Sequence, residues 1–194
     1  ENNYYYSEVK GRELYFVNEG LKVPKYGQAE LVEAETSFTA YQEFQSMLTR
    51  DRIDIFMVGE FDDYQVLQAL HRFPLEGRQV DLQFSYSQPY VNVVKEKIEP
   101  RQSSQSILQL GYQFPCQYGD KDYFALIVFN AMFGEFAHSA LFTTLREKEG
   151  LAYSISSQFD IFTGLLEVYA GIEKSNRDQA MRGISRELNY IKLG

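Results

Sequence analysis

Four short segments after residue 90 are rich in apolar residues, several of them in alternation with polar ones. Alternation with a period of two is typical of a strand that places one face on a core. The last two segments are separated only by Asp160 to Thr163, a length that fits a hairpin. The pattern predicts strands over residues 91–98, 106–114, 151–159 and 164–172.

Apolar residues three or four positions apart predict helices around these strands. The first helix is expected from Thr36 onward, Asp62 can cap the second, and Gly134 separates a strongly apolar third helix from a fourth over about 136–149. Ser175 and Asp178 resemble a capping box for the last helix. The stripes are Tyr41, Phe44 and Leu48; Val66, Leu67, Leu70 and Phe73; Phe124, Ile127, Val128 and Ala131; and Met181, Ile184, Leu188 and Ile191.

The remaining segments lack a helical period. Residues 1–35 are polar and predict irregular chain with a turn at Pro24 to Gly27, whereas Ile53 to Val58 predicts a short buried strand. Residues 74–90 combine proline, glycine and polar positions, which is typical of a linker. The order of elements therefore predicts an α+β fold, in which helices cover one face of an antiparallel-rich sheet.

Composition fits a folded, soluble protein. The 194 residues are 44% hydrophobic, with fifteen Tyr, fifteen Phe and no Trp, which is enough for one core or two smaller lobes. A net charge of −8 argues against nucleic acid as the main partner. The chain has one cysteine, Cys116, and no signal peptide or apolar run of about twenty residues, so we expect a cytoplasmic protein without a disulfide or membrane span.

The most informative segment runs from Leu141 to Ser157. Its composition favours a helix up to Glu149, Gly150 is the residue type that commonly closes a helix, and a strand follows. Arg146 and Tyr153 lie on opposite sides of this corner, so a guanidinium and a phenol can face one cleft. The alternative is a surface arginine that pairs with a neighbouring glutamate, and a half-buried strand tyrosine.

This segment, with its phrase Leu-Arg-Glu-Lys-Glu-Gly-Leu-Ala-Tyr, resembles the C-terminal lobe of pitrilysin-type zinc metallopeptidases, the family of insulinase and mitochondrial processing peptidase. The resemblance covers roughly residues 21–192. It implies that Arg146 and Tyr153 bind and polarise the substrate backbone, while zinc is bound by an H-x-x-E-H helix in another lobe. Three further segments follow the family's order: Val23-Pro-Lys-Tyr-Gly27, Asp54-Ile-Phe-Met-Val-Gly-Glu-Phe-Asp62 and Gln105-Ser-Ile-Leu-Gln-Leu-Gly-Tyr112.

The chain departs from the family in its histidines, since His71 and His138 are the only two and neither lies in H-x-x-E-H or its inverse. We therefore expect no catalytic residue and no metal in this chain, and no activity from it alone. The resemblance implies that residues 1–73 are the tail of one lobe and 91–194 most of a second. The expected partner is an H-x-x-E-H lobe or subunit that carries the zinc, in a homo- or heterodimeric assembly.

Two alternatives to this substrate-binding role stay open at this point: an inactive scaffolding relative and a plain peptide-binding module. Glu135 and His138 form an E-x-x-H pair on one helical face, but two ligands rarely make a metal site, so we favour a packed or surface histidine. Cys116 lacks any arrangement typical of a nucleophile.

Overall fold

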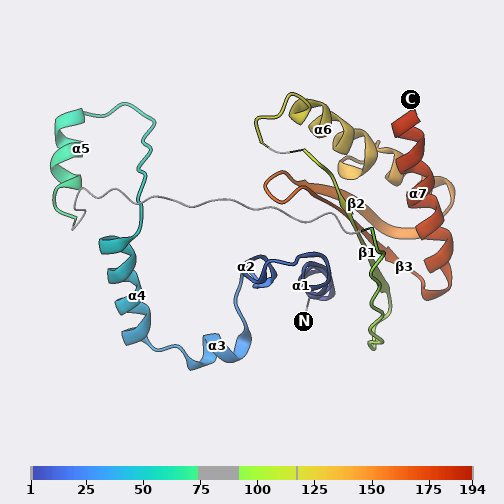
Figure 1. Cartoon of the computed structure of the whole chain (residues 1–194), viewed down its shortest axis with the longest axis horizontal. Helices are drawn as coiled ribbons and strands as arrows, with labels where there is room; N and C mark the ends of the chain where they lie inside the picture. The colour runs from blue at the N-terminus through green and yellow to red at the C-terminus, as the bar shows by residue number, and fades with distance from the viewer. Residues whose placement is uncertain (1, 74–91, 117, 194) are drawn as a thin grey trace. The chain divides into compact units, whose positions relative to one another are not determined.

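The computed structural model describes residues 2–73, 92–116 and 118–193 (Figure 1). Of these, residues 2–23 belong to one compact unit with those from 92 onward, and residues 24–73 belong to another. The predicted linker, residues 74–90, lies outside the described residues. The assignment of residues 1–73 and 91–194 to two peptidase-like lobes stays a prediction.

The larger unit is built on a three-stranded antiparallel sheet. Its strands are β1 (Ser106–Gln113), β2 (Ala152–Asp160) and β3 (Leu165–Ile172), in the order β1-β3-β2. β2 and β3 form the predicted hairpin, and Gly164 adopts a φ of +66° in the turn between them. Three of the four strands predicted after residue 90 are thus confirmed, and so is the α+β class.

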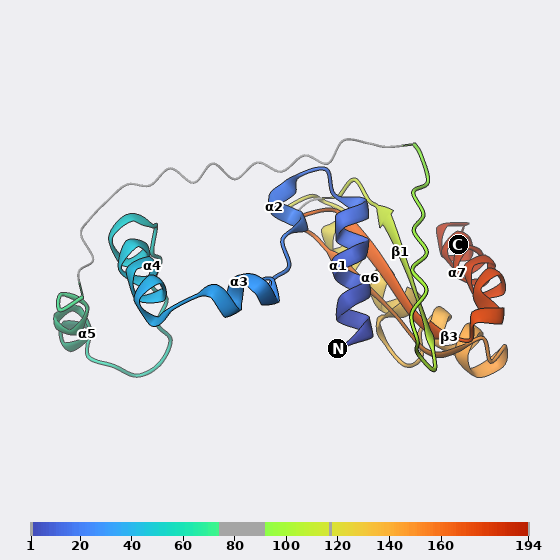
Figure 2. The ribbon, with the colours of Figure 1, turned by 90° about the horizontal axis from the view of Figure 1, so that it is seen from below.

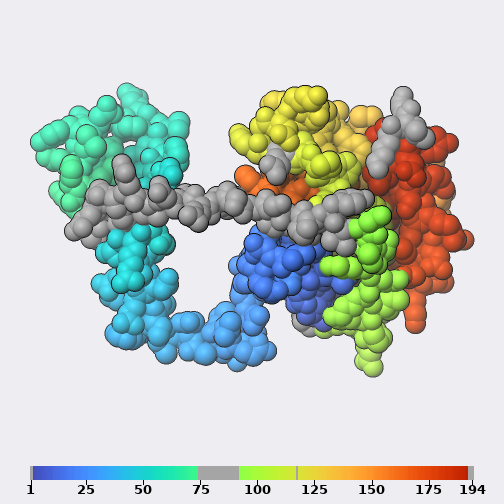
Figure 3. Space-filling model, in the orientation of Figure 1, coloured from blue at the N-terminus to red at the C-terminus, as the bar shows by residue number. Residues whose placement is uncertain are grey.

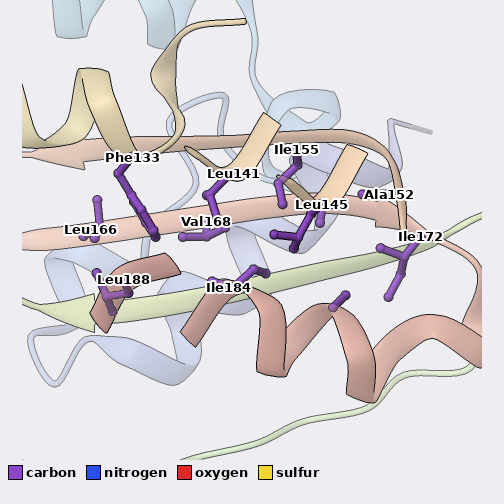
Figure 4. Packing of buried hydrophobic residues seen from close by; sticks show 12 residues of the cluster. Phe133, Leu141, Leu145, Ala152, Ile155, Leu166, Val168, Ile172, Ile184 and Leu188 are labelled. Atoms are coloured by element: carbon purple, nitrogen blue, oxygen red, sulfur yellow. The ribbon is translucent and has the colours of Figure 1, made fainter. Parts of the chain in front are cut away.

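The hydrophobic core lies on one face of this sheet, because alternate residues of β3, such as Leu166 and Val168, are fully buried there. Figure 4 shows Ile184 and Leu188 of the last helix lying against this face, with Phe133, Leu141 and Leu145 of the preceding helical segments. Phe133 lies in the π-helical turn η1 (Ala131–Glu135), which follows the helix α6 (Tyr123–Asn130). Leu141 immediately precedes a second π-helical turn, η2 (Phe142–Lys148), which contains Leu145, and the last helix is α7 (Arg177–Leu193).

The start of α7 differs from the prediction. Ser175 lies in a short 3-10 turn, η3 (Lys174–Asn176), and its hydroxyl is 3.5 Å from Glu173 Oε2. The Asp178 carboxylate accepts a hydrogen bond from Arg177 Nη1 at 2.9 Å. The predicted capping box does not stand at the start of α7, because Ser175 lies inside η3, two positions before Arg177, the first residue of α7.

The opposite face of the sheet is covered by α1 (Asn3–Tyr15), as Figure 2 shows. The prediction of irregular chain over residues 1–35 is therefore wrong. The Asn2 side chain caps α1, and the Tyr4 hydroxyl is hydrogen bonded to Ser154 of β2. Gly11 lies so close to the sheet that a β-carbon there would be 2.5 Å from Gln109 Nε2. A polar helix can pack here because the sheet face beneath it is polar.

The strand predicted over residues 91–98 is not formed by the described residues 92–98. Val94 and Ile98 are 95% and 70% exposed, so these apolar side chains have no core to alternate against. The segment instead lies beside α1, as Figure 3 shows, where Glu99 Oε2 accepts a hydrogen bond from the Tyr6 hydroxyl at 2.6 Å. The Arg101 guanidinium stacks 4.0 Å from the centre of the same ring.

The smaller unit contains the two helices predicted there. The Thr36 side chain caps α4 (Ser37–Arg50), and the Asp62 side chain accepts from Gln65 N at 3.0 Å to cap α5 (Asp63–Leu70). The strand predicted over Ile53 to Val58 is wrong, because no described strand pairs with this segment. This unit also contains the short helix α3 (Ala29–Ala34), whereas α2 (Glu19–Lys22) belongs to the larger unit. The turn at Pro24 to Gly27 is confirmed by a 2.9 Å hydrogen bond from Gly27 N to Pro24 O.

Among the described helices, none is both long enough and apolar enough to cross a membrane.

Candidate functional site

The predicted corner between helix and strand is formed by η2, Gly150 and the start of β2. Residues 136–139 form a turn rather than the predicted helix. η2 ends in two hydrogen bonds whose partners are farther apart in sequence than in an α-helix, from Glu149 N to Thr144 O (2.9 Å) and from Leu151 N to Leu145 O (2.8 Å). Gly150 has a φ of +63°, a conformation in which a side chain is strained. The predicted role of Gly150 in closing this helix is confirmed.

Arg146 lies on the exposed side of η2, directly after the buried Leu145. Its guanidinium stacks on the Phe142 ring, 4.6 Å from the ring centre. Within the part of the chain that the structure describes, no ion pair involves Arg146, and the Glu149 carboxylate binds Arg186 Nη2 at 2.6 Å instead. The guanidinium therefore has its hydrogen-bond donors available for a carbonyl or carboxylate.

Tyr153 occupies an irregular position of β2. Ala152 pairs with Ile172 and Ser154 pairs with Gly171, so Tyr153 is the extra residue of a β-bulge. Bulges bend a strand and redirect a side chain, and they are frequent beside active sites. The Tyr153 side chain is 51% exposed, which places its phenol where a ligand can reach it.

The Tyr153 hydroxyl donates a hydrogen bond to Glu173 Oε1 at 3.0 Å. This bond, together with the negative charge of Glu173, raises the pKa of the Tyr153 phenol above its usual value. Sequence reasoning did not find Glu173, because the two residues are twenty positions apart and meet only through the pairing of β2 with β3.

Arg146 and Tyr153 thus lie on either side of the Gly150 corner, each with a different contact. The guanidinium rests on Phe142 and the phenol on Glu173, and no hydrogen bond joins the two predicted residues among the described contacts. Both offer donors and neither is buried. Chemically, this pair can hold peptide oxygens but cannot abstract a proton at neutral pH.

The other candidate pair, Glu135 and His138, has neighbours typical of packing. Asn130 Nδ2 donates to Glu135 Oε2 at 3.0 Å, and the His138 ring is stacked on Phe136 with centroids 5.6 Å apart. Across residues 2–73, 92–116 and 118–193, no three His, Cys, Asp or Glu side chains are grouped in a way that could hold a metal ion.

A second polar cluster lies on the side of the sheet that faces α1. Glu167 is only 2% exposed, and its carboxylate accepts hydrogen bonds from Gln109 Nε2 at 3.2 Å and Gln158 Nε2 at 3.0 Å. Burial raises the pKa of Glu167, while hydrogen bonds from Gln158 and Tyr169 and the charge of Arg12 act in the opposite direction. A glutamate inside the apolar run of β3 is the sequence signal for this cluster.

Comparison with known proteins agrees with the fold and with the predicted resemblance. The sequence profile of the family described as "Peptidase M16 inactive domain" matches residues 40–194. The chain therefore belongs to this family, and the predicted relationship to metallopeptidases of the pitrilysin and insulinase type is confirmed.

The relatives of the chain include two proteins of Bacillus subtilis (strain 168). The "Probable inactive metalloprotease YmfF" is 36% identical over 169 residues, 87% of this chain and 40% of that protein. The "Uncharacterized zinc protease YmxG" is 26% identical over 180 residues, 90% of this chain and 42% of that protein.

A similar fold is found in the crystal structure of a conserved protein from Enterococcus faecalis V583. Its TM-score is 0.88 at 38% identity, over 97% of this chain and 45% of that chain. The chain thus spans less than half the length of each of these three proteins.

Proposed function

We propose that this chain is a non-catalytic, substrate-binding part of a metallopeptidase of the M16 family. Its Arg146 and Tyr153 hold the peptide backbone beside a zinc ion that is bound by an H-x-x-E-H motif in another lobe or subunit. The observation that carries the proposal is the corner at Gly150, where an arginine without an ion pair among the described residues and a bulged, half-exposed tyrosine flank one turn.

The family's zinc does not fit the residues that the structure describes, since they contain no suitable group of ligands. The role of this chain is therefore confined to positioning and polarising the substrate. The Arg146 guanidinium offers a planar set of donors to a backbone carbonyl. The Tyr153 hydroxyl can donate to the oxygen on which negative charge develops as the peptide bond is attacked.

A scaffolding relative without proteolysis is the second candidate. Two observations favour it: the Tyr153 hydroxyl is already engaged by Glu173, and a 36% identical relative is named as probably inactive. The two functions differ in whether Arg146 and Tyr153 affect peptide cleavage.

The test is peptide cleavage by the full-length protein combined with its H-x-x-E-H partner. Because one oxyanion donor typically contributes a factor of about 100 or more, Arg146→Ala and Tyr153→Phe should each lower kcat/KM by roughly that factor. Arg182→Ala and Tyr190→Phe, which change exposed residues of α7, are matched controls and should leave it unchanged.

Cleavage that persists unchanged in both Arg146→Ala and Tyr153→Phe contradicts the substrate-binding role. Absence of zinc-dependent cleavage in every pairing favours the scaffold.

A further inference from the structure

We propose that Glu173 is a positioning residue that holds the hydroxyl proton of Tyr153, so that a bound peptide must compete with Glu173 for that proton. This inference rests on the proposed function, because it assigns a resting partner to one of the two groups that contact the peptide. Glu173 thereby sets how readily the site accepts a substrate.

The position of Glu173 is fixed by the same strand pairing that creates the bulge at Tyr153. Ile172 ends β3 and pairs with Ala152, the first residue of β2, so Glu173 follows β3 at the end of the sheet where Tyr153 lies, one position into β2. The Glu173 carbonyl accepts a hydrogen bond from Asn176 N at 3.0 Å, which ties its backbone to the following turn.

Both carboxylate oxygens of Glu173 have neighbours. Oε1 accepts the Tyr153 hydroxyl at 3.0 Å, and Oε2 lies 3.5 Å from the Ser175 hydroxyl. The Glu173 and Tyr153 side chains are nevertheless exposed, so a peptide can reach them without moving any buried residue. The contact is thus formed before a ligand arrives and remains open to competition.

The competition follows from the chemistry of a phenol, which has one proton and can donate it in one direction at a time. A carboxylate is a stronger acceptor than a neutral peptide carbonyl, because a charge-assisted hydrogen bond is roughly twice as strong as a neutral one. At rest the proton of Tyr153 therefore points to Glu173. It becomes available to the peptide only when the contact with Glu173 is weakened or exchanged.

The substitution that tests this is Glu173→Gln, which keeps the shape of the side chain and removes its charge. A neutral acceptor holds the phenol proton less strongly, so the full-length protein, assembled with its partner, should bind fluorescein-labelled casein roughly three times more tightly. Glu147→Gln removes the same charge from the exposed side of η2 and is the matched control.

The double variant Tyr153→Phe/Glu173→Gln separates the contact from the general effect of charge. Phenylalanine at position 153 has no hydroxyl proton for residue 173 to hold. The effect of Glu173→Gln on the Kd for labelled casein should therefore disappear in the Tyr153→Phe background. The pKa of the Tyr153 phenol gives a second readout, obtained as the difference between the ultraviolet titration of each protein and that of its Tyr153→Phe counterpart. Because Glu173 raises this pKa, Glu173→Gln should lower it.

The results distinguish this inference from the proposed function. Suppose that Tyr153→Phe weakens binding, but Glu173→Gln changes the Kd equally in the wild-type and Tyr153→Phe backgrounds or does not change it at all. Glu173 then does not control the proton of Tyr153, and only the role given to Glu173 fails. If Tyr153→Phe leaves binding and cleavage unchanged, the proposed function fails and the role of Glu173 fails with it.

Discussion

Gly134 allows η1 to approach the sheet closely, and Gly134→Ala should therefore destabilise the larger unit. Gly134 is buried, and a β-carbon there would lie 2.5 Å from Ser157 Oγ and 2.8 Å from both Ser157 Cβ and Leu141 Cδ1. Real β-carbons essentially never approach another heavy atom this closely, so either the helical segment or β2 must move.

The size of the effect follows from three contributions. Overpacking a core typically costs about 1–3 kcal/mol. A shift of Ser157 also weakens its buried 2.8 Å hydrogen bond to Asn130 Oδ1, which contributes about 1 kcal/mol. The greater helix propensity of alanine offsets up to about 1 kcal/mol. The net loss in the free energy of unfolding is about 1–3 kcal/mol, equivalent to a fall of roughly 2–12 °C in Tm for a chain of this size.

The assay is thermal and urea unfolding of Gly134→Ala, Ser157→Ala and the double variant. Ser157→Ala removes the atom nearest to the added methyl group, so the alanine at position 134 should be better tolerated in that background. Unchanged or increased stability in Gly134→Ala would refute the reasoning. Strict additivity of the two substitutions would show that Ser157 is not the group being displaced.

Three further predictions concern the candidate site, the buried carboxylate and the core. Arg146→Lys keeps the charge but not the planar set of donors, so kcat/KM for peptide cleavage by the assembled protein should fall about tenfold; full activity would mean that charge alone suffices. Because burial raises the pKa of Glu167, its charged form reduces stability at neutral pH, and this penalty disappears as the pH falls through the raised pKa. Glu167→Gln should therefore be more stable relative to wild type at pH 8 than at pH 4 in urea unfolding, and a difference independent of pH would contradict this. Leu145→Ala removes a fully buried side chain and should lower the free energy of unfolding by about 2–5 kcal/mol, whereas a loss below 1 kcal/mol would mean that the site collapses around the smaller residue.

The elements predicted correctly are those that local pattern and core burial specify together. Apolar and polar residues alternate in β2 because one of its faces is covered, and β3 is largely apolar because both of its faces are covered. Gly150 ends η2 because few other residue types adopt its backbone conformation. The strand predicted at Ile53 to Val58 is wrong for the converse reason, since an apolar run forms a strand only where a neighbouring strand completes its hydrogen bonds.

The helix α1 could not be predicted, because its stability does not depend on an apolar stripe. Its contacts join residues far apart in the sequence: Tyr4 to Ser154, and Asn3 to Ser103 over 100 positions. A polar helix becomes recognisable only once the sheet presents polar side chains for it to cover. The same holds for the buried Glu167, whose hydrogen-bond donors Gln109 and Gln158 come from β1 and β2.

The sequence by itself determined the class of fold, the family, the corner at Gly150 and the choice of Arg146 and Tyr153 as candidate residues, because these depend on local periodicity and on a contiguous motif. Only the tertiary structure placed Tyr153 in a bulge and brought Glu173 to its hydroxyl. Both facts depend on the register between β2 and β3, and a strand's register is fixed by the side chains of both partners and the core beneath them rather than by either segment alone.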